Sequence, residues 1–300
     1  MFYNDDFINM PRTIFHIGYH KTGTTWFQKK FYPFVRNYKY LKPVELQFFL
    51  GNPLAPLVLH NKNIMHRSFI YCNEELSGNI HNGGLNGHLS KNVADRIYYF
   101  NKDSEIIIFI RRQDSMINSI YKQYIKKGGN YSIKNYLFHK EFDYQHRTPL
   151  FNFEHINYKN LIDYYVSIFG KNNVRIYLYE ELESNIIFFL NKFRTELDLD
   201  INLDNLDLSI ANKGYSKPLL KIVKAFNYLR STDVLYKKYF LNAKNINKCI
   251  NFLEKQNSLT SASKIYMLDD DLKNYIHNYF INSNLLLERK YHLPIKKYWY

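Results

Sequence analysis

Short runs of β-favouring residues alternate with longer amphipathic stretches, and this alternation constrains the fold more than any other feature. The expected strands are Thr13–Gly18, Ser68–Asn73, Glu105–Ile110 and Val174–Tyr179. Two of these runs are almost continuously apolar, as strands covered on both faces are. The helix-like stretches include Ser115–Lys127, Tyr158–Phe169 and Leu182–Leu197. This order predicts an α/β fold with a central parallel β-sheet flanked by helices in a three-layer architecture.

The strand signals stop near residue 205, and the rest of the chain is expected to be helical. Amphipathic patterns predict helices over Pro218–Leu229 and Asp269–Lys290. The 300 residues contain no internal repeat and no low-complexity linker, so we expect a single domain over residues 1–300. The segment Gly51–His66 is rich in Asn, Pro and His and has no clear period. It is either a surface connection, or a lid or loop over the sheet that binds a substrate.

The charge balance indicates an anionic partner but does not select one. Lys and Arg number 41 against 27 Asp and Glu, a formal charge of +14. Nucleic acid, anionic lipid and a phosphate- or sulfate-bearing ligand all fit this excess. A nucleic-acid-binding protein, one alternative function, would carry a Lys/Arg stripe or a recognised binding motif. The sequence has neither, so we expect no nucleic-acid partner.

Cysteine and hydrophobic patterns exclude further classes. Cys72 and Cys249 are too few for a disulfide framework or a four-ligand zinc site, and Cys72 lies in an apolar run typical of a buried thiol. No His/Cys/Asp/Glu cluster has metal-ligand spacing, so we expect no metal. The N-terminal residues do not resemble a signal peptide, and no run of about 18 apolar residues occurs. We therefore expect a soluble, cytoplasmic protein.

The strongest local signal is Gly18–Trp26, which reads G-Y-H-K-T-G-T-T-W. It follows an expected strand and opens a helix, the context of a phosphate-binding loop. Backbone N–H groups at a helix N-terminus bind an oxyanion, glycines permit close approach, and Lys21 adds charge. A nucleoside-triphosphate P-loop has its Lys directly after the second glycine, where this chain has Thr24. That departure disfavours a P-loop kinase, the other alternative function.

The order K-T-G-T-T-W resembles the 5′-phosphosulfate loop of sulfotransferases that use 3′-phosphoadenosine 5′-phosphosulfate (PAPS). The resemblance implies that Lys21 contacts the oxygen that bridges phosphate and sulfate. It also implies that the phosphate is held by hydroxyl and amide groups of the loop residues Thr22, Gly23, Thr24 and Thr25. No metal is needed for this transfer, and the product nucleotide is 3′,5′-adenosine bisphosphate.

A second element resembles the 3′-phosphate site of the same family. Arg111 follows the expected strand Glu105–Ile110, and Ser119 comes eight residues later. A guanidinium presents a fork of donors to a phosphate, and a Ser hydroxyl adds another. The spacing favours Arg111, although the adjacent Arg112 stays open as the ligand. Lys213 lies in N-K-G, where cytosolic members have R-K-G; it is either a further phosphate ligand or an ordinary turn lysine.

Further motifs are similar to the bacterial-type branch of this family. They are R-Q at 112–113, S-I-Y-K-Q-Y at 119–124, G-G at 128–129, N-Y at 157–158, F-G at 169–170, N-V at 173–174, E-E-L at 180–182 and S-N at 283–284. The resemblance spans Thr13 to Tyr291 and implies a three-layer fold like that of P-loop nucleotide-binding proteins. It implies transfer of a sulfuryl group from PAPS to a hydroxyl, with a carbohydrate of a surface polysaccharide or glycolipid as the expected acceptor.

Two residues are candidates for the base that deprotonates the acceptor. Glu74 follows the strand Ser68–Asn73, whose carboxyl end should open onto the site, and N-E-E-L-S-G resembles the branch motif E-x-L-S-G. Like-charge repulsion from Glu75 is expected to make Glu74 a stronger base. Alternatively, both glutamates only start a helix. His20, inside the phosphate loop, is the second candidate, and the choice stays open.

Aromatic residues near the two ends have structural interpretations. We expect Trp26 and Phe27 to pack in the core. The C-terminal segment Ile295–Tyr300 combines lysines with aromatic residues. It either folds onto the domain or touches a membrane interface or a glycolipid acceptor. Peripheral contact at the cytoplasmic face of a membrane therefore stays open.

Overall fold

The structure is a computed structural model, and it describes residues 11–47, 58–59, 67–80, 88–138, 151–209, 216–229, 248, 252, 267–298 and 300. The chain divides into two compact units. The first comprises Met1–Ser77, Leu89–Ile110 and Leu161–Leu208; the second comprises Gly78–His88, Arg111–Asn160 and Ser209–Tyr300. We describe each unit by itself, and the expectation of one domain over residues 1–300 stays a prediction.

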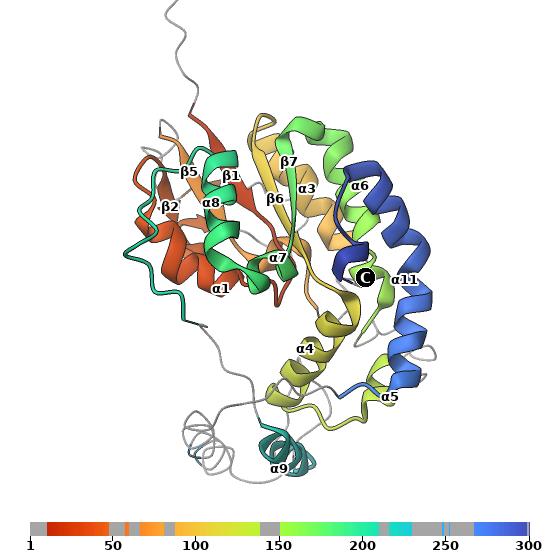
Figure 1. Cartoon of the computed structure of the whole chain (residues 1–300). Helices are drawn as coiled ribbons and strands as arrows, with labels where there is room; N and C mark the ends of the chain where they lie inside the picture. The colour runs from red at the N-terminus through yellow and green to blue at the C-terminus, as the bar shows by residue number, and fades with distance from the viewer. Residues whose placement is uncertain are drawn as a thin grey trace, which may run out of the picture. The chain divides into compact units, whose positions relative to one another are not determined.

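The first unit contains a five-stranded, fully parallel sheet in the order β2-β5-β1-β6-β7 (Figure 1). Its strands are β1 (Thr13–His16), β2 (Lys39–Leu41), β5 (Phe69–Cys72), β6 (Glu105–Ile110) and β7 (Val174–Leu178). Every residue of β1 and β5 is buried. The expected central parallel sheet is confirmed. The sequence did not indicate the edge strand β2, because its three residues run from exposed to buried and make no apolar run.

Helices cover both faces of this sheet (Figure 1). On one face lie α1 (Thr24–Trp26), its π-helical continuation Phe27–Phe31, and α8 (Ile186–Glu196). On the other lie α3 (His88–Phe100) and α6 (Tyr158–Phe169). The alternation of side chains along β1 explains this arrangement. His16 packs against Phe27 at 5.2 Å between ring centroids, and its neighbour Phe15 packs against Phe100 at 6.0 Å. The predicted three-layer architecture is confirmed.

The helix expected over Leu182–Leu197 is wrong as a single element. The structure has α7 (Tyr179–Ser184) and α8 instead, separated by Asn185 with φ −152° and ψ 89°. The Asn185 side chain accepts a hydrogen bond from the backbone N–H of Phe188 and so caps α8. Asn is a strong N-cap residue because its side-chain oxygen satisfies an N–H group of the first turn. Local capping therefore overrides the continuous amphipathic pattern.

The second unit is helical, which confirms the helical C-terminal part. It contains α4 (Gln113–Lys126), α5 (Ile133–Leu137), the 3-10 helix Phe153–Ile156, α9 (Lys217–Asn227) and α11 (Asp270–Tyr291). Asn227 of α9 donates to the carbonyls of Ile125 and Gly129, 2.8 Å each, and so ties α9 to the end of α4. Within the described ranges, no helix has the length and apolar character needed to cross a membrane.

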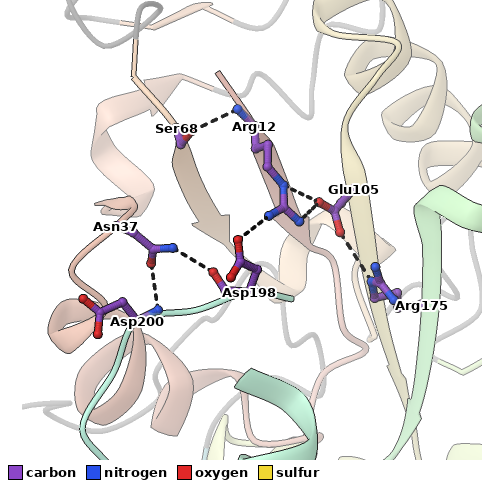
Figure 2. A network of polar contacts seen from close by, with 7 residues as sticks. All are labelled: Arg12, Asn37, Ser68, Glu105, Arg175, Asp198 and Asp200. Carbon is purple, nitrogen blue, oxygen red and sulfur yellow. Dashed lines mark hydrogen bonds and ion pairs between the residues drawn. The ribbon is translucent and has the colours of Figure 1, made fainter. Parts of the chain in front are cut away.

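Polar residues connect the amino ends of four strands in the first unit (Figure 2). Arg12, just before β1, donates through Nε to Glu105 of β6 at 3.0 Å, and its backbone N–H donates to the Ser68 hydroxyl at 3.0 Å. Arg175 of β7 donates to the other Glu105 oxygen at 3.4 Å. Arg12 Nη1 also lies 3.3 Å from Asp198 Oδ2. The amino edge of the sheet is thus closed by charges that pair with one another.

Candidate functional site

The carboxyl edge of the same sheet positions the candidate site. The strand β1 lies between β5 and β6, and the chain leaves it in one direction towards β2 and β5 and later in the other towards β6. In open α/β sheets, ligands bind outside the carboxyl ends of the strands at such a switch point. The loop that follows β1 and the turn that follows β5 both open at this edge.

The loop after β1 contains two residues with a left-handed backbone conformation. Its first part continues the pairing with β6, because Ile17 N–H donates to Ile107 at 2.9 Å and Tyr19 N–H donates to Phe109 at 3.3 Å. Lys21 then adopts φ 68° and Gly23 φ 91°. The left-handed region is costly for a residue with a Cβ, and such strain concentrates at functional sites.

Both glycines of the loop are required by its geometry. A Cβ at Gly18 would lie 2.8 Å from His16 Nε2 and 3.1 Å from the Thr22 hydroxyl, so any side chain there would force the loop apart. Gly23 is the N-cap of α1 and has no side chain to cap it, while its carbonyl accepts from Trp26 N–H at 2.8 Å. Because the first N–H groups of a helix have no partner within the helix, this start of α1 suits an oxyanion.

The predicted phosphate-loop residues differ in what they can offer. The Thr22 hydroxyl donates to the Tyr19 carbonyl, and Thr22 as a whole is fully buried. Thr24 is buried, and Thr25 is partly exposed. Lys21 is partly exposed as well. Trp26 and Phe27 are buried, which confirms their expected place in the core.

A histidine that the sequence did not single out lies directly beneath the loop. His16 is fully buried, stacks on Phe109 at 4.9 Å and contacts the Tyr32 hydroxyl through Nδ1 at 2.8 Å. Burial lowers the pKa of His16 to about 3, so the ring is neutral. Within the part of the chain that the structure describes, its Nε2 has no hydrogen-bond partner. Nothing in the sequence indicated this role, because a histidine within an apolar strand is indistinguishable from an ordinary core residue.

The two candidate bases lie at this edge with different partners. His20 Nε2 lies 3.3 Å from Glu75 Oε1, and the His20 side chain is almost completely buried. Glu74 instead accepts from Gln28 Nε2 at 3.3 Å, and Gln28 also donates to the Cys72 carbonyl at 3.0 Å. The sequence predicted that Glu75 acts on Glu74; the structure places the Glu75 carboxylate beside His20.

The helix-start interpretation of the two glutamates is also visible. Glu74–Ser77 form one 3-10 turn. The Asn73 side chain accepts from Glu75 N–H at 3.0 Å, and the Ser77 hydroxyl donates to the Glu74 carbonyl at 2.8 Å. These bonds fix the backbone of the turn and leave both carboxylates to other partners, so the turn can serve structure and chemistry together.

The predicted 3′-phosphate residues belong to the second unit. Arg111 Nε donates to the Ser115 hydroxyl at 3.0 Å, and its carbonyl accepts from Tyr158 at 2.6 Å. Arg112 instead binds the Asp114 carboxylate through two hydrogen bonds of 2.6 and 3.1 Å. Asp114 therefore compensates the Arg112 charge, while the eight-residue spacing to Ser119 keeps Arg111 as the predicted phosphate ligand. Ser119 lies one helical turn beyond Ser115 on the same face of α4.

Several motif residues converge to hold the start of α4. The amides of Gln113 and Asn284 exchange two buried hydrogen bonds of 2.8 and 3.1 Å. The neighbouring Ser283 hydroxyl donates to Asn157 at 2.5 Å. These positions are far apart in the sequence, and only the fold shows that they tie α4 to α11 and to the start of α6.

Some sequence predictions concern residues that the structure does not describe. Lys213 lies outside the described residues, as do Cys249 and, apart from β4 (Val58–Leu59), the segment Gly51–His66. The β4 strand pairs antiparallel with β3 (Leu46–Gln47). No group of three or more His, Cys, Asp or Glu that could hold a metal ion occurs among the residues with described positions.

Comparison with solved structures defines the fold. A crystal structure of a sulfotransferase from Alicyclobacillus acidocaldarius aligns with a TM-score of 0.59 and 14% identity, over 96% of this chain and 98% of that one. The protein has a sulfotransferase fold. Mouse sulfotransferase SULT7A1 complexed with PAP aligns with a TM-score of 0.40 and 15% identity, over 94% and 87% of the two chains. No family model and no curated protein matches the sequence.

Proposed function

We propose that this protein is a sulfotransferase that moves the sulfuryl group from PAPS to a hydroxyl acceptor. The phosphate loop after β1 carries the proposal: left-handed Lys21 and Gly23 lead into a helix start that no side chain caps. The Lys that precedes the second glycine suits a phosphosulfate better than a nucleoside triphosphate. Arg111, whose Nε donates to the Ser115 hydroxyl on the same helix face as Ser119, supports recognition of a second phosphate.

In the proposed reaction each residue has a distinct role. Amides of Thr22, Gly23, Thr24 and Thr25 hold the 5′-phosphate, while Arg111 and Ser119 bind the 3′-phosphate. Lys21 stabilises the charge that develops on the oxygen that bridges sulfur and phosphorus as the bond between sulfur and this oxygen breaks. Electrostatic stabilisation of this kind is often the largest contribution to catalysis. Lys213 and Arg112 stay open as further ligands of the 3′-phosphate, and the proposed reaction needs no metal.

The acceptor hydroxyl must lose its proton as its oxygen attacks sulfur. We assign Glu74 as the base and His20 as the second candidate. The His20 ring presents Nε2 to Glu75, and its Nδ1 is buried without a partner among the described residues. Neither ring nitrogen is therefore open to an acceptor, whereas the Glu74 side chain is partly exposed.

The sequence resemblance suggests the acceptor class, and the cellular location stays a prediction from the sequence patterns. We propose a carbohydrate hydroxyl of a surface polysaccharide or glycolipid and a cytoplasmic location. The C-terminal segment bears on membrane contact: Ile295 and Tyr300 are buried, which favours packing of this segment on the protein over insertion into an interface.

One titration tests the donor. Calorimetry with the full chain compares 3′,5′-adenosine bisphosphate, ATP with Mg²⁺, and a DNA oligomer. We expect tight binding of the bisphosphate alone. Tighter binding of ATP with Mg²⁺ would replace the proposal with a P-loop kinase, and binding of DNA alone would replace it with a nucleic-acid-binding protein.

A further inference from the structure

The helix α4 carries a polar face that extends beyond the two residues assigned to the 3′-phosphate. Ser115, Ser119 and Lys122 are spaced by four and three residues, so they follow one another along one side of the helix. Arg111 Nε donates to the Ser115 hydroxyl at 3.0 Å, which draws the guanidinium to the first member of this row. A cation therefore stands at each end of the row, with two hydroxyls between them.

Lys122 is held in an unfavourable electrostatic state. Its side chain is half-buried, and burial lowers its pKa; the nearby positive charge of Arg111 lowers that pKa further. The acidic residue of the first turn, Asp114, is already bound to Arg112. With the residues that the structure describes, Lys122 forms no ion pair. Lys122 and Arg111, close enough for their charges to repel each other, favour an anion beside them.

We propose that Lys122 is a third group that binds the phosphate held by Arg111 and Ser119, and that Ser115 positions the Arg111 guanidinium. This inference rests on the proposed function and names what its nucleotide site selects. A phosphate monoester carries nearly two negative charges at neutral pH, which one guanidinium cannot balance. Lys122 supplies the second positive charge and thereby sets the preference for a nucleotide with a 3′-phosphate over one with a free 3′-hydroxyl.

The test compares two ligands on the full chain by calorimetry: 3′,5′-adenosine bisphosphate and adenosine 5′-monophosphate. Lys122→Met is expected to weaken bisphosphate binding about ten-fold and to change monophosphate binding by less than about two-fold. Lys122→Arg keeps the charge and should retain the preference. Lys127→Met is the matched control, because Lys127 is an exposed lysine at the end of the same helix.

Thermal unfolding gives a second test, in which the variant should be more stable than the wild type without ligand and less stabilised by the ligand. Because a lowered Lys pKa means that the charged form destabilises the native state at neutral pH, Lys122→Met should raise the melting temperature without ligand. The same variant should lose most of the stabilisation that the bisphosphate confers on the wild type. A lysine with a merely structural role would lower the melting temperature and leave the ligand preference intact. If Lys122→Met fails to fold, Lys122→Gln gives the same comparison.

The positioning role of Ser115 has its own readout. Ser115→Ala should reduce the preference for the bisphosphate about three-fold, while Ser115→Thr, which keeps the hydroxyl, restores it. If the wild type binds both nucleotides equally, the proposed function fails and the inference fails with it. If the wild type prefers the bisphosphate and Lys122→Met keeps the full preference, only the assignment of Lys122 is overturned.

Discussion

The two edges of the parallel sheet treat their polar groups in opposite ways. At the amino edge, Arg12 and Arg175 share Glu105, and Asp198 adds a further carboxylate (Figure 2). At the carboxyl edge, the start of α1 has no side-chain cap and His16 Nε2 has no partner among the described residues. The chain pairs its charges where they hold strands together. At the carboxyl edge it leaves the first N–H groups of α1 without a side-chain cap, where we propose that a ligand supplies the partner.

The contrast predicts that carboxyl-edge substitutions affect chemistry and that amino-edge substitutions affect stability. The largest effect is expected for Glu74→Gln, which keeps the hydrogen-bonding shape but cannot accept the proton. Turnover should fall by about 10²–10⁴, while affinity for 3′,5′-adenosine bisphosphate stays within about two-fold. Turnover is measured with labelled PAPS and a panel of glycan acceptors.

Glu75→Gln is the matched control, since it makes the same change on the adjacent residue of the same turn. It should lower turnover much less than Glu74→Gln, because the Glu75 carboxylate contacts His20. The reverse order, a severe loss in Glu75→Gln with near-normal turnover in Glu74→Gln, would move the base role to the His20–Glu75 pair.

Lys21→Ala is expected to have the next largest effect. Removal of one preorganised donor to the leaving group should lower turnover by about 10²–10³. Stability should change little, because Lys21 occupies a left-handed conformation that disfavours both residues alike. Lys29→Ala removes an exposed lysine from the adjoining π-helical segment and serves as the control. Equal turnover in the two variants would show that the loop does not hold the reacting groups.

Glu105→Gln should have the smallest effect on turnover and a clear effect on stability. The Glu105 side chain is only 12% exposed, so its loss leaves two arginines without their shared partner. We expect the free energy of unfolding to fall by about 2 kcal/mol, below the cost of breaking a fully buried pair because both arginines are partly exposed. Urea unfolding measures this change.

Asp198→Asn provides the comparison within the same network. The Asp198 side chain is 85% exposed, and an exposed ion pair contributes less than about 1 kcal/mol. An effect of Asp198→Asn as large as that of Glu105→Gln would show that burial does not govern this network. Altered nucleotide binding in Glu105→Gln, without loss of stability, would break the distinction between the two edges.

Local patterns predicted the elements that carry uninterrupted signals. The bounds of β6 and α6 agree fully with the sequence expectation, because six consecutive residues of β6 favour strand and α6 has a regular apolar face. The division at Asn185 was missed because a side-chain cap leaves the amphipathic pattern unchanged on both sides. The edge strand β2 was missed because its residues are only partly buried.

The sequence by itself determined the alternating fold, and it predicted the phosphate loop after β1 and the two candidate bases near it, because these depend on residue order over short distances. Only the tertiary structure decided the partners. His20 meets Glu75 across 55 residues, and His16 turns its Nε2 beneath Gly18. Gln113 meets Asn284 across 171 residues. Such choices depend on which side chains share a face, and residue order over short distances does not specify them.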